Sequence, residues 1–186
     1  RLMNIHFNVS SPVKFTEEQK TLTIYATCNG FSYMSSSLDP SSFTWSTGDP
    51  SVATVDQSGV IRLKSKGNTT VTATLKSCPD KILTADLNAY YDLEDSKETS
   101  LTYTGSWKYT GKPITFSPVL KFHDRTLTEG KDYTLSFSNN QNSGVGTFTI
   151  TGLGLYSGTL TNNFGIWQIN LSQAEVTFSQ SSYLYT

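Results

Sequence analysis

Side chains that could carry acid–base chemistry are few in this sequence. The histidines are His6 and His123, and His123 begins the run His123-Asp124-Arg125. A serine hydrolase needs a histidine base and a carboxylate that orients it, so one of these two would have to serve. The sequence contains no Gly-x-Ser-x-Gly turn and no phosphate-binding glycine loop. We therefore expect both histidines to be ordinary half-exposed residues, and we expect a protein that is not an enzyme.

A cluster of carboxylates occupies Asp86–Glu98, with Tyr90-Tyr91 inside it. Carboxylate oxygens are calcium ligands, but this stretch lacks the Asp-x-Asp-x-Asp-Gly spacing that wraps the cation. Charge runs are more often solvated faces. The stretch is therefore predicted to be a solvated loop, and no metal or other cofactor is expected.

Aromatic side chains are the remaining candidates for ligand contact. A row of exposed rings would stack on sugars, whereas buried rings would pack the core or the seam between modules. The second alternative is favoured, because aromatic side chains dominate burial energetics in small cores. The candidate stacking residues are Tyr103, Trp107, Tyr109 and Tyr156, with Tyr183 near the end of the sequence.

Composition favours a β-rich protein of one large domain or two small ones. The 186 residues carry 14 Lys+Arg and 15 Asp+Glu, a net charge of −1 that gives no reason to expect nucleic acid or an anionic membrane as partner. No apolar run approaches the roughly 18 residues that span a bilayer, so no direct membrane insertion is expected. Thr, Ser, Tyr and Phe are abundant, and β-branched and aromatic residues suit pleated sheets.

The first 78 residues alternate short strand patterns with turn signals such as Gly48-Asp49-Pro50 and Ser58-Gly59. Closely spaced strands of this kind predict a β-sandwich, in which Trp45 is expected to be a core residue. The predicted strands are Leu22–Cys28, Phe43–Ser46, Val52–Val55, Val60–Leu63 and Thr69–Leu75.

Three consecutive motifs carry a family resemblance: Trp45–Asp56 (WSTGDPSVATVD), Ser58–Ile61 (SGVI) and Lys66–Thr74 (KGNTTVTAT). In this order they resemble the bacterial immunoglobulin-like domain, group 2, over about residues 8–78. The resemblance implies an immunoglobulin-like sandwich as the first module, residues 1–78.

The second half contains Tyr109–Pro113 (YTGKP), Gly130–Tyr133 (GKDY) and Gly146–Gly152 (GTFTITG). These blocks resemble a Tyr-Thr-Gly-Lys-Pro type repeat of bacterial surface proteins, over about residues 80–166. The resemblance implies a second sandwich, residues 79–166, in tandem with the first. We expect residues 79–104 to supply its first strand and the acidic loop.

The Tyr109-Thr110 pair recurs at Tyr185-Thr186. This echo predicts that residues 167–186 begin a further, truncated repeat, and that the partners of the chain include neighbouring repeats. The overall fold class is therefore all-β, with two tandem immunoglobulin-like β-sandwich modules.

Cys28 and Cys78 are the two cysteines. In an immunoglobulin-like sandwich these positions end two strands of opposite sheets at the same end of the body, which would suit a disulfide. An oxidising extracellular location would preserve the bond. The alternative is two reduced thiols that act as small apolar fillers.

Two functions of different class follow from these expectations. The first is a non-catalytic stalk or spacer of an extracellular, cell-surface or secreted bacterial protein, with adhesion to host ligands as a further role. The alternative is a carbohydrate-binding or substrate-docking module attached to a secreted enzyme.

Overall fold

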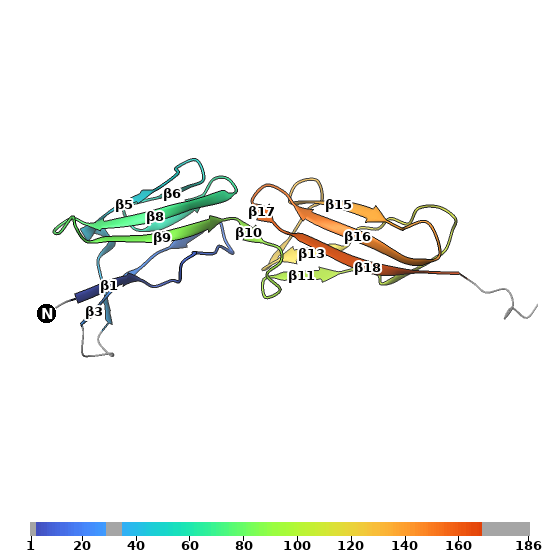
Figure 1. Cartoon of the computed structure of the whole chain (residues 1–186), viewed down its shortest axis with the longest axis horizontal. Coiled ribbons are helices and arrows are strands. Elements are labelled where there is room, and N and C mark those ends of the chain that lie inside the picture. The colour runs from blue at the N-terminus through green and yellow to red at the C-terminus, as the bar shows by residue number, and fades with distance from the viewer. Residues whose placement is uncertain (1–2, 29–34, 169–186) are drawn as a thin grey trace, which may run out of the picture.

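The protein forms two groups of β-strands that follow one another along its long axis (Figure 1). The structure, a computed structural model, describes residues 3–28 and 35–168. Apart from the single 3-10 turn η1 (Pro40–Ser42), the regular elements in these ranges are all strands. The predicted all-β fold class of two sandwich modules is confirmed.

The first module contains three antiparallel sheets. In spatial order they are β1 (Met3–Phe7), β3 (Ile24–Cys28) and β4 (Ser35–Ser37); β2 (Gln19–Thr21), β7 (Val60–Leu63) and β6 (Ala53–Val55); and β5 (Phe43–Thr47), β8 (Gly67–Leu75) and β9 (Ile82–Ala89).

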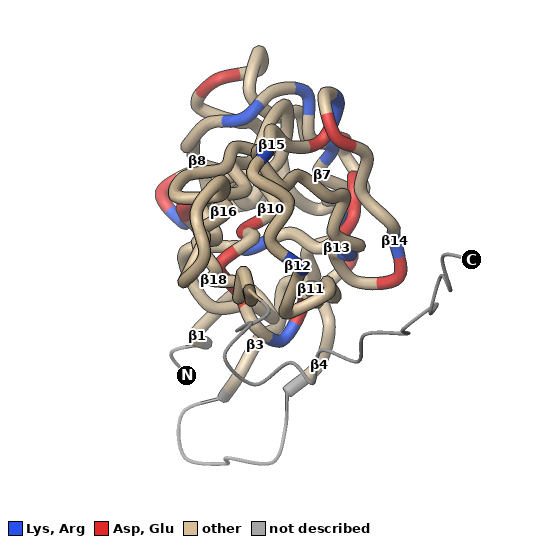
Figure 2. The backbone as a smooth tube through the Cα atoms, turned by 90° about the vertical axis from the view of Figure 1, so that its right-hand side faces the viewer, with Lys and Arg blue, Asp and Glu red and all other residues tan. Residues whose placement is uncertain are grey.

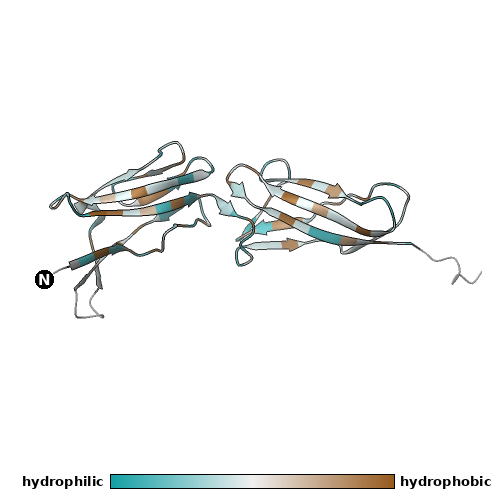
Figure 3. Cartoon of the chain, viewed as in Figure 1, coloured by the Kyte–Doolittle hydropathy of each residue, from teal (hydrophilic) through white to brown (hydrophobic). Residues whose placement is uncertain are grey.

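Alternation along the strands builds the core of the first module. Phe43 and Trp45 on β5 face inward, as do Val71 and Ala73 on β8. Along β8, hydrophobic segments accordingly alternate with paler ones in Figure 3. Trp45 is only 4% exposed, and its indole Nε1 donates to the Pro40 carbonyl oxygen at 3.0 Å. The prediction that Trp45 is a core residue is confirmed.

Residues 82–89 belong to the first module, whereas the sequence pattern assigned them to the second. They form β9, which pairs with β8 along its whole length, from Thr74 opposite Ile82 to Gly67 opposite Ala89. The predicted start of the second module at residue 79 is therefore wrong, because this strand closes the first module. The inward positions of β9 are small or aliphatic, namely Ala85, Leu87 and Ala89.

The second module is a sandwich of a three-stranded and a four-stranded sheet. The first contains β11 (Thr99–Thr102), β13 (Val119–Phe122) and β14 (Arg125–Thr126). The second contains β12 (Ser106–Lys108), β18 (Thr159–Trp167), β16 (Gly144–Gly152) and β15 (Tyr133–Ser138). A further short pair joins β10 (Tyr91–Asp92) to β17 (Tyr156–Ser157). The β10–β17 and β12–β18 pairs are parallel, and the other strand pairs are antiparallel.

Phe116 lies at the centre of an aromatic core in the second module. Its ring makes edge contacts with Phe148 at 5.3 Å and Phe164 at 5.1 Å between centroids. Gly146 allows Phe164 to pack this closely, since a Cβ at Gly146 would lie 2.4 Å from the Cζ atom of that ring. The offset and edge-on arrangement is the one that aromatic quadrupoles favour.

Two sequence predictions concern residues beyond this part of the chain. Residues 169–186, which include Tyr183 and the Tyr185-Thr186 echo, lie outside the described residues, so the predicted further repeat stays a prediction. Within the described ranges, no helix has the length and apolar character needed to cross a membrane.

Candidate functional site

The junction between the modules is the best-defined candidate site. Only Tyr90 separates the last residue of β9 from the first residue of β10. On the far side of Tyr90 the chain is bonded at once to the second module, because the Tyr91 N–H donates to the Leu155 carbonyl oxygen at 2.8 Å. The Leu93 N–H donates to Ser157 O at 2.9 Å. The connection is therefore a continuous path of bonded backbone rather than a free tether.

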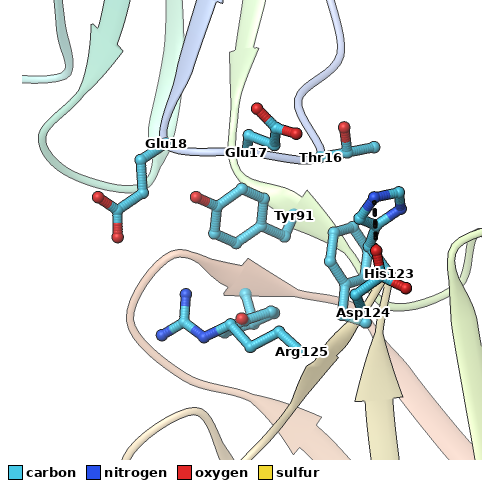
Figure 4. A pocket seen from close by; sticks show the side chains of 9 residues that line it. Thr16, Glu17, Glu18, Tyr91, His123, Asp124 and Arg125 are labelled. Carbon is cyan, nitrogen blue, oxygen red and sulfur yellow. Dashed lines mark ion pairs between the residues drawn. The ribbon is translucent and has the colours of Figure 1, made fainter.

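A cleft of about 510 Å³ opens at this junction (Figure 4). Thr16, Glu17 and Glu18 of the first module line one wall. The opposite wall comes from the second module and consists of Tyr91, Phe122, His123, Asp124, Arg125 and Tyr156. The cleft is thus built from four segments that are far apart in the sequence.

The floor of the cleft is aromatic and tightly packed. The Tyr91 ring lies 5.0 Å from Tyr156 and 5.4 Å from Phe122, centroid to centroid, and Phe122 meets Tyr156 edge-on at 5.8 Å. All three side chains are at most 3% exposed. Burial, followed by the charge of Glu18, raises the pKa of Tyr91 to about 12. Burial also raises the pKa of Tyr156.

Arg125 caps this floor. Its guanidinium carbon lies 5.9 Å from the centre of the Tyr156 ring, within the range of a cation–π contact. Its Nη2 also lies 3.8 Å from the buried carboxylate of Asp132, which accepts a hydrogen bond from the Thr128 N–H. In Figure 4, Glu18 and Arg125 point toward the same opening from opposite walls, with the Tyr91 hydroxyl between them.

His123 stands at the edge of the cleft between two carboxylates. Its Nδ1 lies 3.1 Å from Glu98 Oε2, and its Nε2 lies 3.4 Å from Asp124 Oδ2. Its backbone adopts a positive φ of 51°, a turn conformation. A histidine activates serine or cysteine for nucleophilic attack, and among the described residues His123 hydrogen-bonds to neither. The geometry is that of a turn held by polar contacts.

The prediction that the acidic stretch is a solvated loop is wrong in part, because Asp86 lies in β9 and Asp92 in β10. Several of its carboxylates accept backbone hydrogen bonds at the junction. Asp92 Oδ1 accepts from the Glu94 N–H at 3.0 Å, and Asp95 Oδ1 accepts from the Lys97 N–H at 3.1 Å. Glu94 reaches further and accepts from the Thr159 N–H at 2.9 Å. In the described ranges, no group of three or more His, Cys, Asp or Glu side chains is arranged to hold a metal ion.

The predicted stacking residues pack against the module itself. Trp107 stacks on Phe116 at 5.2 Å with an interplanar angle of 15°, and Tyr103 stacks on the same ring at 6.2 Å. The buried Trp107 Nε1 has no hydrogen-bond partner among the described residues. Tyr109 is half-buried against the core, and Tyr156 lies in the junction floor. Tyr103 and Trp107 thus both pack on Phe116, whereas Tyr156 lies at the junction between the modules. The prediction that these rings stack on carbohydrate stays a prediction.

The cysteine prediction depends on a side chain that is not described. Cys78 lies in the turn between β8 and β9, where it is half-buried. Its expected partner is Cys28, the last residue of β3, whose side chain lies outside the described residues. The disulfide therefore stays a prediction.

Positive and negative residues are mixed over the described part of the chain. Viewed along the long axis, the Lys and Arg positions of the described residues are interspersed with those of Asp and Glu (Figure 2). This agrees with a net charge of −1 and gives no basic stripe of the kind that follows a nucleic-acid backbone.

Comparisons with known proteins support the first resemblance. Residues 11–85 match the family model of the bacterial Ig-like domain (group 2). The expected Tyr-Thr-Gly-Lys-Pro repeat finds no support of this kind and stays a prediction. No curated protein matches the chain.

Two of the similar solved structures are of the S-layer protein SbsC. Domains 4 and 5 of the S-layer protein SbsC share 17% identity, with 89% of this chain and 98% of that chain covered and a TM-score of 0.32. The structure of domains 1–6 of surface layer protein SbsC shares 13% identity, with 91% of this chain and 28% of that chain covered and a TM-score of 0.31. At these scores the likeness decides nothing about fold or function.

Sequence reasoning missed most of the junction. Glu17 and Glu18 carried no signal, because each is an ordinary charged residue until four distant segments meet. Tyr90-Tyr91 was one visible sign, because two adjacent large side chains between strand patterns are too apolar for an exposed tether. The run His123-Asp124-Arg125 and Tyr156 were singled out too, but for acid–base chemistry and ring stacking rather than for a junction.

Proposed function

We propose that this chain is a non-catalytic spacer of an extracellular bacterial surface protein. Its two modules hold neighbouring segments apart at a fixed separation. The match of residues 11–85 to a bacterial Ig-like domain supports the proposal, and so does the end-to-end arrangement of the two modules.

The one-residue connection at Tyr90 carries the argument. Asn88, near the end of β9, donates its N–H to Val13 O at 3.0 Å, and Tyr91 is bonded to the second module. A flexible linker would need several residues free of such contacts. The backbone therefore has little room to rotate at the junction, and one module restricts the orientation of the next.

Side chains from both modules close over this connection. Lys66, in the loop that precedes β8, donates from Nζ to the Tyr156 carbonyl oxygen at 3.4 Å. Tyr91 is buried by Phe122 and Tyr156. These contacts serve orientation, and among the described residues none favours carbohydrate docking over a spacer role.

Single-molecule fluorescence energy transfer between dyes at Lys64 and Lys121 tests the rigidity, since both side chains are exposed and lie in different modules. We expect one narrow distance distribution. Inserting Gly-Ser-Gly-Ser between Tyr90 and Tyr91 should broaden it, which provides the matched control. A native distribution as broad as that of the insertion variant would contradict the proposal.

The extracellular part of the proposal has its own test. Antibodies against this chain, applied to intact and to lysed cells of the source bacterium, should label intact cells or the medium. Labelling only after lysis would rule out a surface spacer.

A further inference from the structure

The strands by which the chain enters and leaves the second module are bonded to each other at both of its ends. Near the first module, β10 pairs in parallel with β17. At the far end, β12 pairs in parallel with the last residues of β18. The outermost bonds of this second contact run from Gly165 N to Gly105 O and from Tyr109 N to Trp167 O, each at 2.8 Å.

The leaving segment is almost continuous between these two contacts. Only Gly158 separates β17 from β18, so residues 156–167 run the length of the module as one stretch. This stretch meets the entering chain first at Tyr91-Asp92 and again at Ser106–Lys108. Figure 1 shows β10 and β17 at the junction, while β18 ends on the opposite side of the module.

We infer that this arrangement is a mechanical clamp, meaning the set of bonds between residues 91–109 and residues 155–167 that resists tension along the chain. The inference rests on the proposed spacer role, in which the modules are pulled from their two ends. Tension would pull the entering strand toward the first module and the leaving strand away from it. Within each contact the two strands run in the same direction, so the bonds of that contact lie across the pull and are loaded together.

Side-chain contacts reinforce the clamp along its length. The Thr159 N–H donates to Glu94 Oε1 at 2.9 Å, and the Tyr103 hydroxyl donates to Asn163 O at 3.1 Å. The rings of Tyr91 and Tyr156 lie 5.0 Å apart at its first contact. Each of these contacts joins the entering segment to the leaving one, so each must break before the two segments slide apart.

The first module has a weaker version of the same contact. There the parallel contact is the isolated bridge between Val13 and Leu87. Two backbone bonds serve it, from Val13 N to Asp86 O at 2.7 Å and from Asn88 N to Val13 O at 3.0 Å. Forced unfolding follows the height of the unfolding barrier rather than equilibrium stability. Under tension the first module should therefore yield before the second.

Force spectroscopy on the whole chain, with handles at its two termini, tests this order. We expect two unfolding steps under constant force, each assigned to a module by the gain in contour length. The first module should remain folded for the shorter time. A second module that yields first would overturn the clamp.

A change of pulling direction isolates the clamp from stability. Asn142 is exposed in the loop between β15 and β16, beside the end of β18, since Gly144 pairs with Ile166. Pulling between a handle at Asn142 and the C-terminal handle should peel β18 away one bond at a time. The same protein should then unfold at clearly lower force, and equal force in both directions would refute the inference.

A pair of variants tests one clamp bond. Tyr109→Pro removes the N–H that donates to Trp167, whereas Tyr109→Ala keeps it. The proline variant should unfold under end-to-end tension about fivefold faster than the alanine variant, the effect of one ordinary hydrogen bond. Equal unfolding rates of the two variants under tension would mean that this hydrogen bond bears no load, which would count against the inference. Failure here would leave the spacer proposal standing, since that proposal depends on a narrow distance distribution measured without load.

Discussion

Tyr91→Ala should weaken the second module selectively. Tyr91 is 2% exposed, and its ring packs on Tyr156 and Phe122, both in the second module. Truncating a large buried aromatic to alanine costs about 3–5 kcal/mol, because the lost burial is joined by the cavity left behind. With a urea m-value of about 1–2 kcal/mol/M for a module of this size, the unfolding midpoint should fall by roughly 1.5–5 M.

Tyr90→Ala is the matched control for this prediction. Tyr90 is adjacent in sequence and only half-buried, so its truncation should cost about 1 kcal/mol or less, nearer the effect of a surface change. Urea-dependent hydrogen exchange with peptide mass spectrometry would follow β16 of the second module and β8 of the first separately. The reasoning is refuted if the two variants shift the β16 midpoint equally, or if β8 loses as much protection as β16 in Tyr91→Ala.

Four further outcomes are expected. Trp45→Ala should cost the first module about 3–5 kcal/mol in urea denaturation, and a loss below about 1 kcal/mol would contradict its core position. Gly146→Ala should destabilise the second module by about 1–3 kcal/mol, because the added methyl meets a phenylalanine ring; an unchanged melting temperature would oppose this. The contribution of Tyr91 to the free energy of unfolding should be full below pH 10 and should fall as the pH rises toward 12, because folding raises the pKa of Tyr91 from 10.0 to about 12. In alkaline titrations followed by circular dichroism, Tyr91→Phe should lose less stability over this pH range than the native protein. Intact mass after alkylation in denaturant without reductant should show Cys28 and Cys78 protected as a disulfide, and two alkylated thiols would end that prediction.

Much of the fold could be predicted from local patterns. Strands such as Phe43–Thr47 and Gly144–Gly152 alternate inward apolar and outward polar residues, and this period of two is visible in sequence. β9 was misassigned although its alternation is clear, because a pattern gives a strand but not its partner. The small inward residues Ala85 and Ala89 also gave a weaker signal than the tyrosines that follow them.

The junction could not be predicted in the same way. Its cleft depends on Glu18, Tyr91 and Arg125, which local propensity treats as unrelated positions. The parallel contacts that form the clamp likewise join residues about one module apart in sequence, such as Trp107 and Ile166. Such pairing follows from how the two sheets pack on each other, and the sequence of a single strand does not indicate its partner.

The central claim is that the two modules are held at a fixed mutual orientation by the junction at Tyr90. Residual dipolar couplings of backbone amides, measured for the whole chain in a dilute alignment medium, test it most directly. If the account is right, couplings from β8 and β16 fit a single alignment tensor with the orientations of Figure 1. Two tensors of clearly different magnitude, one for each module, would show independent motion and contradict the account.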